Sequence, residues 1–96
     1  METKRAIDLG GVRLAPYSPC ISVGNHIWVA GQIGTDGGES LGEQTTRCLE
    51  KIDDLLVEAG SSKKDLVRVT VLLLDMGDFS DFNEIYGAWL DGTVLP

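Results

Sequence analysis

The pattern of apolar and polar residues is clearest between Gly42 and Ala59, where apolar or small residues recur at steps of three and four. This spacing places them on one stripe of a helix, while charged residues fill the other side. The stripe consists of Thr45, Cys48, Leu49, Ile52, Leu55, Leu56 and Ala59. Gly60 follows, at the position where positive φ ends many helices. The pattern therefore predicts an amphipathic helix over residues 42–59.

A second amphipathic helix is predicted from about Phe79 to Leu90. Asp78 is expected to cap its first turn, with Asp81 as the reciprocal acid. The stripe expected to be buried consists of Phe79, Phe82, Tyr86 and Trp89. Because each helix must bury its stripe against another layer, the two helices together predict a sheet.

Strands are predicted by shorter runs with β-branched residues. A short edge strand is expected at Ala6–Leu9. A hairpin is expected from Ile21–Val23 and Ile27–Ala30, because the intervening Gly24-Asn25 tolerates positive φ. A fourth strand is expected over Leu66–Leu74, and the glycine-rich residues 34–42 are expected to form a mobile loop. The fold class is therefore α+β, with residues 1–96 forming a single domain.

The net charge of the chain limits which kinds of partner it is expected to bind. Fifteen acidic and eight basic residues give a net charge of −7, which works against binding nucleic acid or an anionic membrane. No apolar run is long enough to span a bilayer. One histidine and the separated Cys20 and Cys48 offer no metal site, and two thiols without a CxxC spacing are typical of a cytoplasmic protein.

A series of short motifs resembles the RidA family, also called the YjgF family. The motifs are Ala15-Pro-Tyr-Ser18, Gly31-Gln32, Glu43-Gln-Thr45, Ala59-Gly60, Val69-Thr-Val71, Asp75-Met76, Asp78-Phe79 and Asn83-Glu-Ile-Tyr86. Their order and spacing carry the resemblance. It implies a chorismate mutase-like sheet with two helices packed on one face. It also implies a homotrimer with clefts between subunits, and the last strands of the family's sheet are absent from this sequence.

The resemblance further implies hydrolytic deamination of reactive enamine and imine acids, such as 2-aminoacrylate and 2-iminobutanoate, to 2-keto acids and ammonia. No cofactor or metal takes part. Tyr17 and Asn83 are expected to line the cleft, and Ala30 and Gly31 to offer backbone groups at the strand end. The catalytic Arg and Glu of the family correspond to positions beyond Pro96. Many relatives carry Ser in place of Ala30.

Three interpretations follow from the resemblance. The protein is an imine deaminase if the chain continues past Pro96. If it ends there, the protein is expected to be a catalytically inactive module that binds a small carboxylate or a protein, or a product that does not fold stably. Tyr17 can also be explained as a packed aromatic residue and Asn83 as a helix-surface residue.

Overall fold

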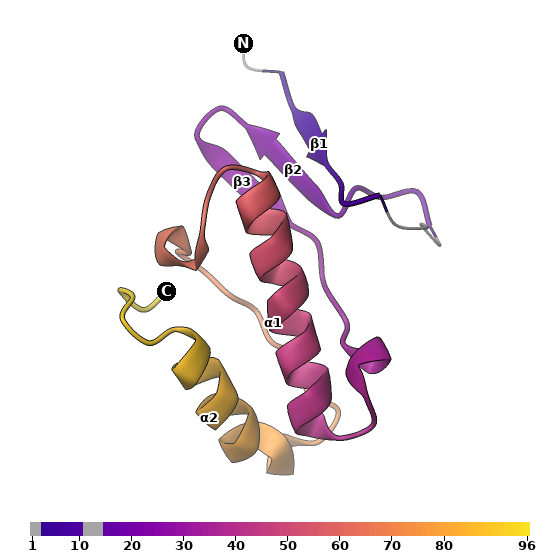
Figure 1. The fold of residues 1–96 in the computed structure, drawn as a ribbon, viewed down its shortest axis with the longest axis vertical. Helices are drawn as coiled ribbons and strands as arrows, with labels where there is room; N and C mark the ends of the chain where they lie inside the picture. Colours follow the sequence, from indigo (N-terminus) through magenta and orange to yellow (C-terminus); the bar gives the residue numbers. More distant parts are fainter. Residues whose placement is uncertain (1–2, 11–14) are drawn as a thin grey trace.

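The computed structural model describes residues 3–10 and 15–96. It shows an α+β fold, as predicted, with a small antiparallel sheet and two helices. Short 3-10 turns connect these elements: η1 (Thr35–Gly37), η2 (Lys63–Asp65) and η3 (Met76–Asp78). In Figure 1 one helix runs through the centre of the molecule, with the sheet towards its carboxyl end and the second helix alongside it.

The sheet consists of β1 (Arg5–Ile7), β2 (Cys20–Val23) and β3 (His26–Val29) in the order β1-β2-β3. It confirms the edge strand and the hairpin, with bounds shifted by one or two residues. Gly24 adopts φ 56° in the turn and Asn25 does not adopt positive φ. A two-residue turn that needs positive φ only at its first central position suits the right-handed twist of the strands.

Helix α1 (Leu41–Glu58) confirms the first predicted helix, and its carboxyl half packs against the sheet. Ser40 and Glu43 close a reciprocal capping box at its start, and Gly60 takes φ 83° after its end. Leu55 is 2% exposed and packs with Ile7 and Cys20 of the sheet. Burying a leucine side chain in this way contributes about 1.5–3 kcal/mol. The core therefore lies between the carboxyl half of α1 and one face of the sheet.

Helix α2 (Phe79–Trp89) packs along α1. The rings of Phe82, Tyr86 and Trp89 stack in sequence, with centroids 5.3 Å and 6.3 Å apart. Trp89 Nε1 donates a hydrogen bond of 2.8 Å to Asp53 of α1. The prediction that Phe79 belongs to the buried stripe is wrong, because its side chain is exposed.

The predicted cap of α2 is also wrong in detail. Asp78 occupies the N-cap position, but its side chain makes no capping hydrogen bond. The turn η3 precedes the helix, and Asp75 accepts a hydrogen bond of 2.8 Å from the Gly77 amide in that turn. The side chain that caps is therefore that of Asp75, and it caps the turn η3 that leads directly into α2.

The fourth strand predicted over Leu66–Leu74 is not formed. The segment is extended, and no described strand pairs with it. It leads from η2 to η3 and crosses behind α1 in Figure 1. Val67 and Leu72 are 88% and 92% exposed. Many β-branched residues show that a segment can fit into a sheet. A strand forms only if a neighbouring strand shares its backbone hydrogen bonds.

Candidate functional site

Tyr17 lies in the connection that leads into β2. Pro16 and Pro19 restrict the backbone around it, and the Tyr17 amide donates to the Ala15 carbonyl at 2.9 Å. Its side chain is 49% exposed. An open hollow of about 420 Å³ is lined by Lys4, Pro16, Tyr17, Ser18 and Ile21. Two hydroxyl groups and one ammonium group beside apolar carbon atoms suit a small anionic ligand.

Sequence reasoning missed Lys4 and Ser18 as neighbours of Tyr17. Antiparallel pairing places Arg5 opposite Ser22 and Ile7 opposite Cys20, which brings the start of the chain alongside the segment before β2. The sequence of residues 6–9 indicated a strand but carried no information about its partner. Only the pairing of the strands reveals Lys4 as a lining residue.

Ala30 and Gly31 lie where β3 ends. The Ala30 amide donates to the Pro19 carbonyl at 2.9 Å, which extends the contact between β2 and β3 by one step. The Gln32 side chain donates to the Ala30 carbonyl at 3.1 Å. Gly31 is exposed, and no atom lies within 4 Å of the position that a Cβ would take. The backbone around Gly31 is therefore open on one side and anchored on its flanks.

A row of side chains on α1 holds the segment that follows Gly31. We call Gln44, Arg47, Cys48 and Lys51 the helix clamp. The Cys48 thiol donates to the Gln32 carbonyl at 3.4 Å, and Lys51 donates to the Ile33 carbonyl at 2.8 Å. The Gln44 side chain donates to the Gly38 carbonyl at 3.1 Å. Residues 34–42, predicted to form a mobile loop, contain the turn η1 and the start of α1, and Gln44 holds Gly38 between them.

Asp36 is the anionic centre of these contacts. Its carboxylate pairs with Lys51 at 2.8 Å and with Arg47 at 3.2 Å. The hydrogen bond from Lys51 is the main reason why the pKa of Asp36 lies below its ordinary value. The hydrogen bond to Asp36 likewise raises the pKa of Arg47.

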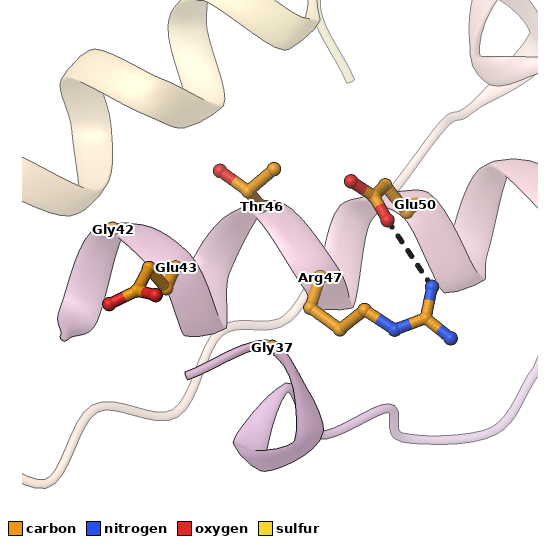
Figure 2. A pocket seen from close by; sticks show the side chains of 6 residues that line it. All are labelled: Gly37, Gly42, Glu43, Thr46, Arg47 and Glu50. Atoms are coloured by element: carbon orange, nitrogen blue, oxygen red, sulfur yellow. Dashed lines mark hydrogen bonds and ion pairs between the residues drawn. The ribbon is translucent and has the colours of Figure 1, made fainter. Parts of the chain in front are cut away.

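A second hollow, of about 430 Å³, lies between η1 and the start of α1 and is lined by Gly37, Gly42, Glu43, Thr46, Arg47 and Glu50. Figure 2 shows Arg47 reaching to Glu50, and the distance between their charged atoms is 3.2 Å. Because Arg47 also pairs with Asp36, its charge is already balanced by two carboxylates. This hollow contains none of the predicted site residues and is a poor anion site.

Asn83 lies on α2 and is exposed. It does not line the hollow around Tyr17, and no described hydrogen bond joins it to Ala30 or Gly31. Within one chain the structure therefore brings Ala30 and Gly31 together, connects them to the segment of Tyr17 through Pro19, and leaves Asn83 apart.

Cys20 is fully buried and Cys48 is half-buried, and both are free thiols. Burial raises the pKa of each thiol. In residues 3–10 and 15–96, no group of three or more His, Cys, Asp or Glu side chains could hold a metal ion. Neither described helix is long and apolar enough to cross a bilayer.

Known proteins resemble this chain in both sequence and fold. A RutC family protein of Pyrococcus abyssi is 48% identical over 82 residues, which cover 79% of this chain and 65% of that protein. The mitochondrial protein mmf1 of Schizosaccharomyces pombe is 36% identical over 91 residues, covering 90% of this chain and 56% of that protein. The 2-iminobutanoate/2-iminopropanoate deaminase of Mus musculus is 32% identical over 87 residues, covering 84% of this chain and 64% of that protein. This chain therefore spans less than two thirds of these relatives' lengths.

The fold comparison agrees. The crystal structure of the Rid family protein YyfA from Yersinia pestis matches with a TM-score of 0.89 and 28% identity, covering 98% of this chain and 81% of that one. A family model described as Endoribonuclease L-PSP matches residues 11–96. The sequence identity to these relatives, the shared fold and this match over most of the chain lead to one conclusion: the chain belongs to the RidA/YjgF family, whose model carries that description.

Proposed function

We propose that the protein hydrolyses reactive enamine and imine acids, such as 2-aminoacrylate and 2-iminobutanoate, to 2-keto acids and ammonia. The observation that carries this proposal is the match over 84% of this chain to a relative named for the deamination of 2-iminobutanoate and 2-iminopropanoate. Family membership alone is a coarser statement, because most of the relatives carry only a family name.

The proposed chemistry asks little of the protein beyond binding and orientation. Water adds to the electrophilic imine carbon, the carbon–nitrogen bond then breaks, and the nitrogen leaves as ammonia. An enamine reaches the same path after it tautomerises to the imine. No electrons are gained or lost, so neither a redox cofactor nor a metal is required. The protein's task is to hold the carboxylate and to place one water molecule beside the carbon atom.

The described residues support parts of this task. Tyr17 and Lys4 line one hollow, and a hydroxyl and an ammonium group can both donate hydrogen bonds to a carboxylate. Ala30 and Gly31 present backbone groups at the end of β3, where Gly31 leaves room for a close approach. Asn83 would complete the site with an amide. We assign the four residues predicted from the sequence to substrate binding: Tyr17, Ala30, Gly31 and Asn83.

Within one chain Asn83 shares no described hydrogen bond or hollow with the other three residues, which supports a site shared between subunits. We propose a homotrimer with its clefts at the subunit interfaces. Trp28 supports an interface on the outer face of the sheet, because its side chain is 65% exposed. It pairs with Ile21 in the sheet, on the face opposite to the buried Cys20.

A coupled assay tests the activity. Threonine dehydratase generates the imine from threonine, and the release of ammonia is followed with and without protein expressed from its natural gene. We expect faster release than from spontaneous hydrolysis, and slower turnover for Tyr17→Phe than for the wild type. Release at the spontaneous rate, together with measurable binding of 2-oxobutanoate, would instead support an inactive carboxylate-binding module. Native mass spectrometry tests the trimer.

Neither RNA nor a membrane is a proposed partner. The family model carries the word endoribonuclease, but a net charge of −7 opposes the approach of a polyanion. We propose a cytoplasmic location, which the free thiols support. One relative is named as mitochondrial, so cell fractionation with antibody detection is the deciding test of location.

A further inference from the structure

The backbone of Gly31 makes no described hydrogen bond that would define where it lies. An added Cβ would meet nothing within 4 Å, and the residue is exposed. The position of the Gly31 backbone is therefore set by the residues on either side of it. On one side Ala30 is tied to Pro19 by a backbone hydrogen bond of 2.9 Å. On the other side, the first tertiary contacts come from the helix clamp.

The helix clamp is built on one face of α1. Positions 44, 47, 48 and 51 follow the spacing that aligns side chains along a helix. They contact the segment 32–38 at successive points: the Gln32 carbonyl, the Ile33 carbonyl, the Asp36 carboxylate and the Gly38 carbonyl. Helix α1, with 18 residues, thus fixes the position of residues 32–38.

Lys51 makes the shortest of these contacts. Its ammonium donates to the Ile33 carbonyl at 2.8 Å and pairs with Asp36 at 2.8 Å, so one group holds both a main-chain atom and a side chain. Hydrogen bonds from a charged donor are stronger than neutral ones. The Ile33 carbonyl lies two residues from Gly31, which is close enough to restrict the backbone there.

We infer that Lys51, anchored by Asp36, is a positioning residue that holds the Ala30–Gly31 backbone in the geometry needed to bind substrate. This inference rests on the proposed function, because it assigns those backbone groups to the imine acid. A displacement of about 1 Å at a reacting centre can cost on the order of 100-fold in rate. Backbone groups that bind the substrate throughout the reaction affect mainly KM.

The central experiment compares Lys51→Met with the matched variant Lys64→Met. Both remove one ammonium group, but Lys64 is an exposed residue of η2. In the coupled assay we expect Lys51→Met to raise KM by about 10- to 100-fold with a smaller change in kcat. Lys64→Met should match the wild type, and Lys51→Arg should restore most of the affinity. A variant that is partly unfolded would show a lower kcat with unchanged KM.

Asp36→Asn separates positioning from overall charge. It makes the protein less negative, whereas Lys51→Met makes it more negative. Simple attraction of an anionic substrate would therefore change KM in opposite directions in the two variants. Positioning predicts that KM rises in both. Opposite changes in KM, or no change in either variant, would overturn the inference.

A second readout does not depend on activity. Backbone ¹⁵N relaxation should give order parameters at Gly31, Gln32 and Ile33 near the rigid value of about 0.85 in the wild type and below about 0.6 in Lys51→Met. If the wild-type protein does not accelerate ammonia release, the proposed function fails and these order parameters still test the clamp. Unchanged order parameters in Lys51→Met would refute positioning even in an active enzyme.

Discussion

Gly34 is the position where the smallest substitution is expected to do the most damage. Its backbone lies against α1, and an added Cβ would fall 1.8 Å from the Gln44 carbonyl oxygen and 2.6 Å from its carbon. The φ of Gly34 is −114°, which alanine adopts readily, so backbone strain plays no part. The effect of Gly34→Ala is therefore purely steric.

The size of the effect follows from what must move. A real Cβ keeps at least 3.0 Å from its neighbours, so the separation from the Gln44 oxygen must grow from 1.8 Å to that value. That oxygen belongs to the backbone of α1 and cannot rotate away as a side chain would. Overpacking typically costs about 1–3 kcal/mol, and we expect about 3 kcal/mol here. The midpoint of thermal unfolding should then fall by roughly 12–24 °C.

Urea and thermal unfolding followed by circular dichroism measure this change, with Gly87→Ala as the matched control. No atom lies within 4 Å of the position of a Cβ at Gly87, and the residue is exposed in the interior of α2. Alanine there should stabilise the protein by about 0.5–1 kcal/mol. A Gly34→Ala variant within about 0.5 kcal/mol of the wild type would refute the steric argument.

Three further predictions concern acid, thiols and the core. The pKa of Asp36 is lowered chiefly by Lys51, so Asp36→Asn should be less stable than the wild type above about pH 4. The difference should vanish at lower pH, as Asp36 of the folded wild type becomes protonated. Iodoacetamide followed by peptide mapping should label Cys48 before the fully buried Cys20, and both more slowly than a free thiol, because burial raises the pKa of both. Leu55→Ala should cost about 2–5 kcal/mol in urea unfolding.

Each of these predictions has a contrary result. A stability difference for Asp36→Asn that persists below about pH 2 would show that the carboxylate charge is not its source. Labelling of Cys20 at the rate of Cys48 would mean that the core opens easily. Val57→Ala is the control for Leu55→Ala, since Val57 is 69% exposed, and an equal loss of stability in both variants would contradict the assigned core.

Local signals explain most of what the sequence predicted correctly. The helix stripes, Gly60 and the Gly24-Asn25 turn each act within a few residues, and the structure contains the helices and the hairpin that they indicate. The segment Leu66–Leu74 failed because strand pairing is a property of two segments, and its own β-branched residues do not supply a partner.

The site was predictable only in part, for a related reason. The polar residues of the helix clamp have the spacing of a solvent-facing side, and nothing local shows that residues 32–38 pass over them. Lys4 became a neighbour of Tyr17 only through pairing of strands that are distant in sequence. Asn83 followed from the family resemblance, and its membership of the site remains a prediction.

The exposed segment after η2 has a consequence for the solubility of the protein. Residues 69–74 contain no charge, proline or glycine, and six-residue windows of this kind readily stack into the cross-β arrangement of amyloid. Arg68 and Asp75 flank the window with opposite charges, as gatekeeper residues do. Where this window is exposed, those two charges oppose self-association, so neutralising Arg68 should promote aggregation at high concentration without altering the folded core.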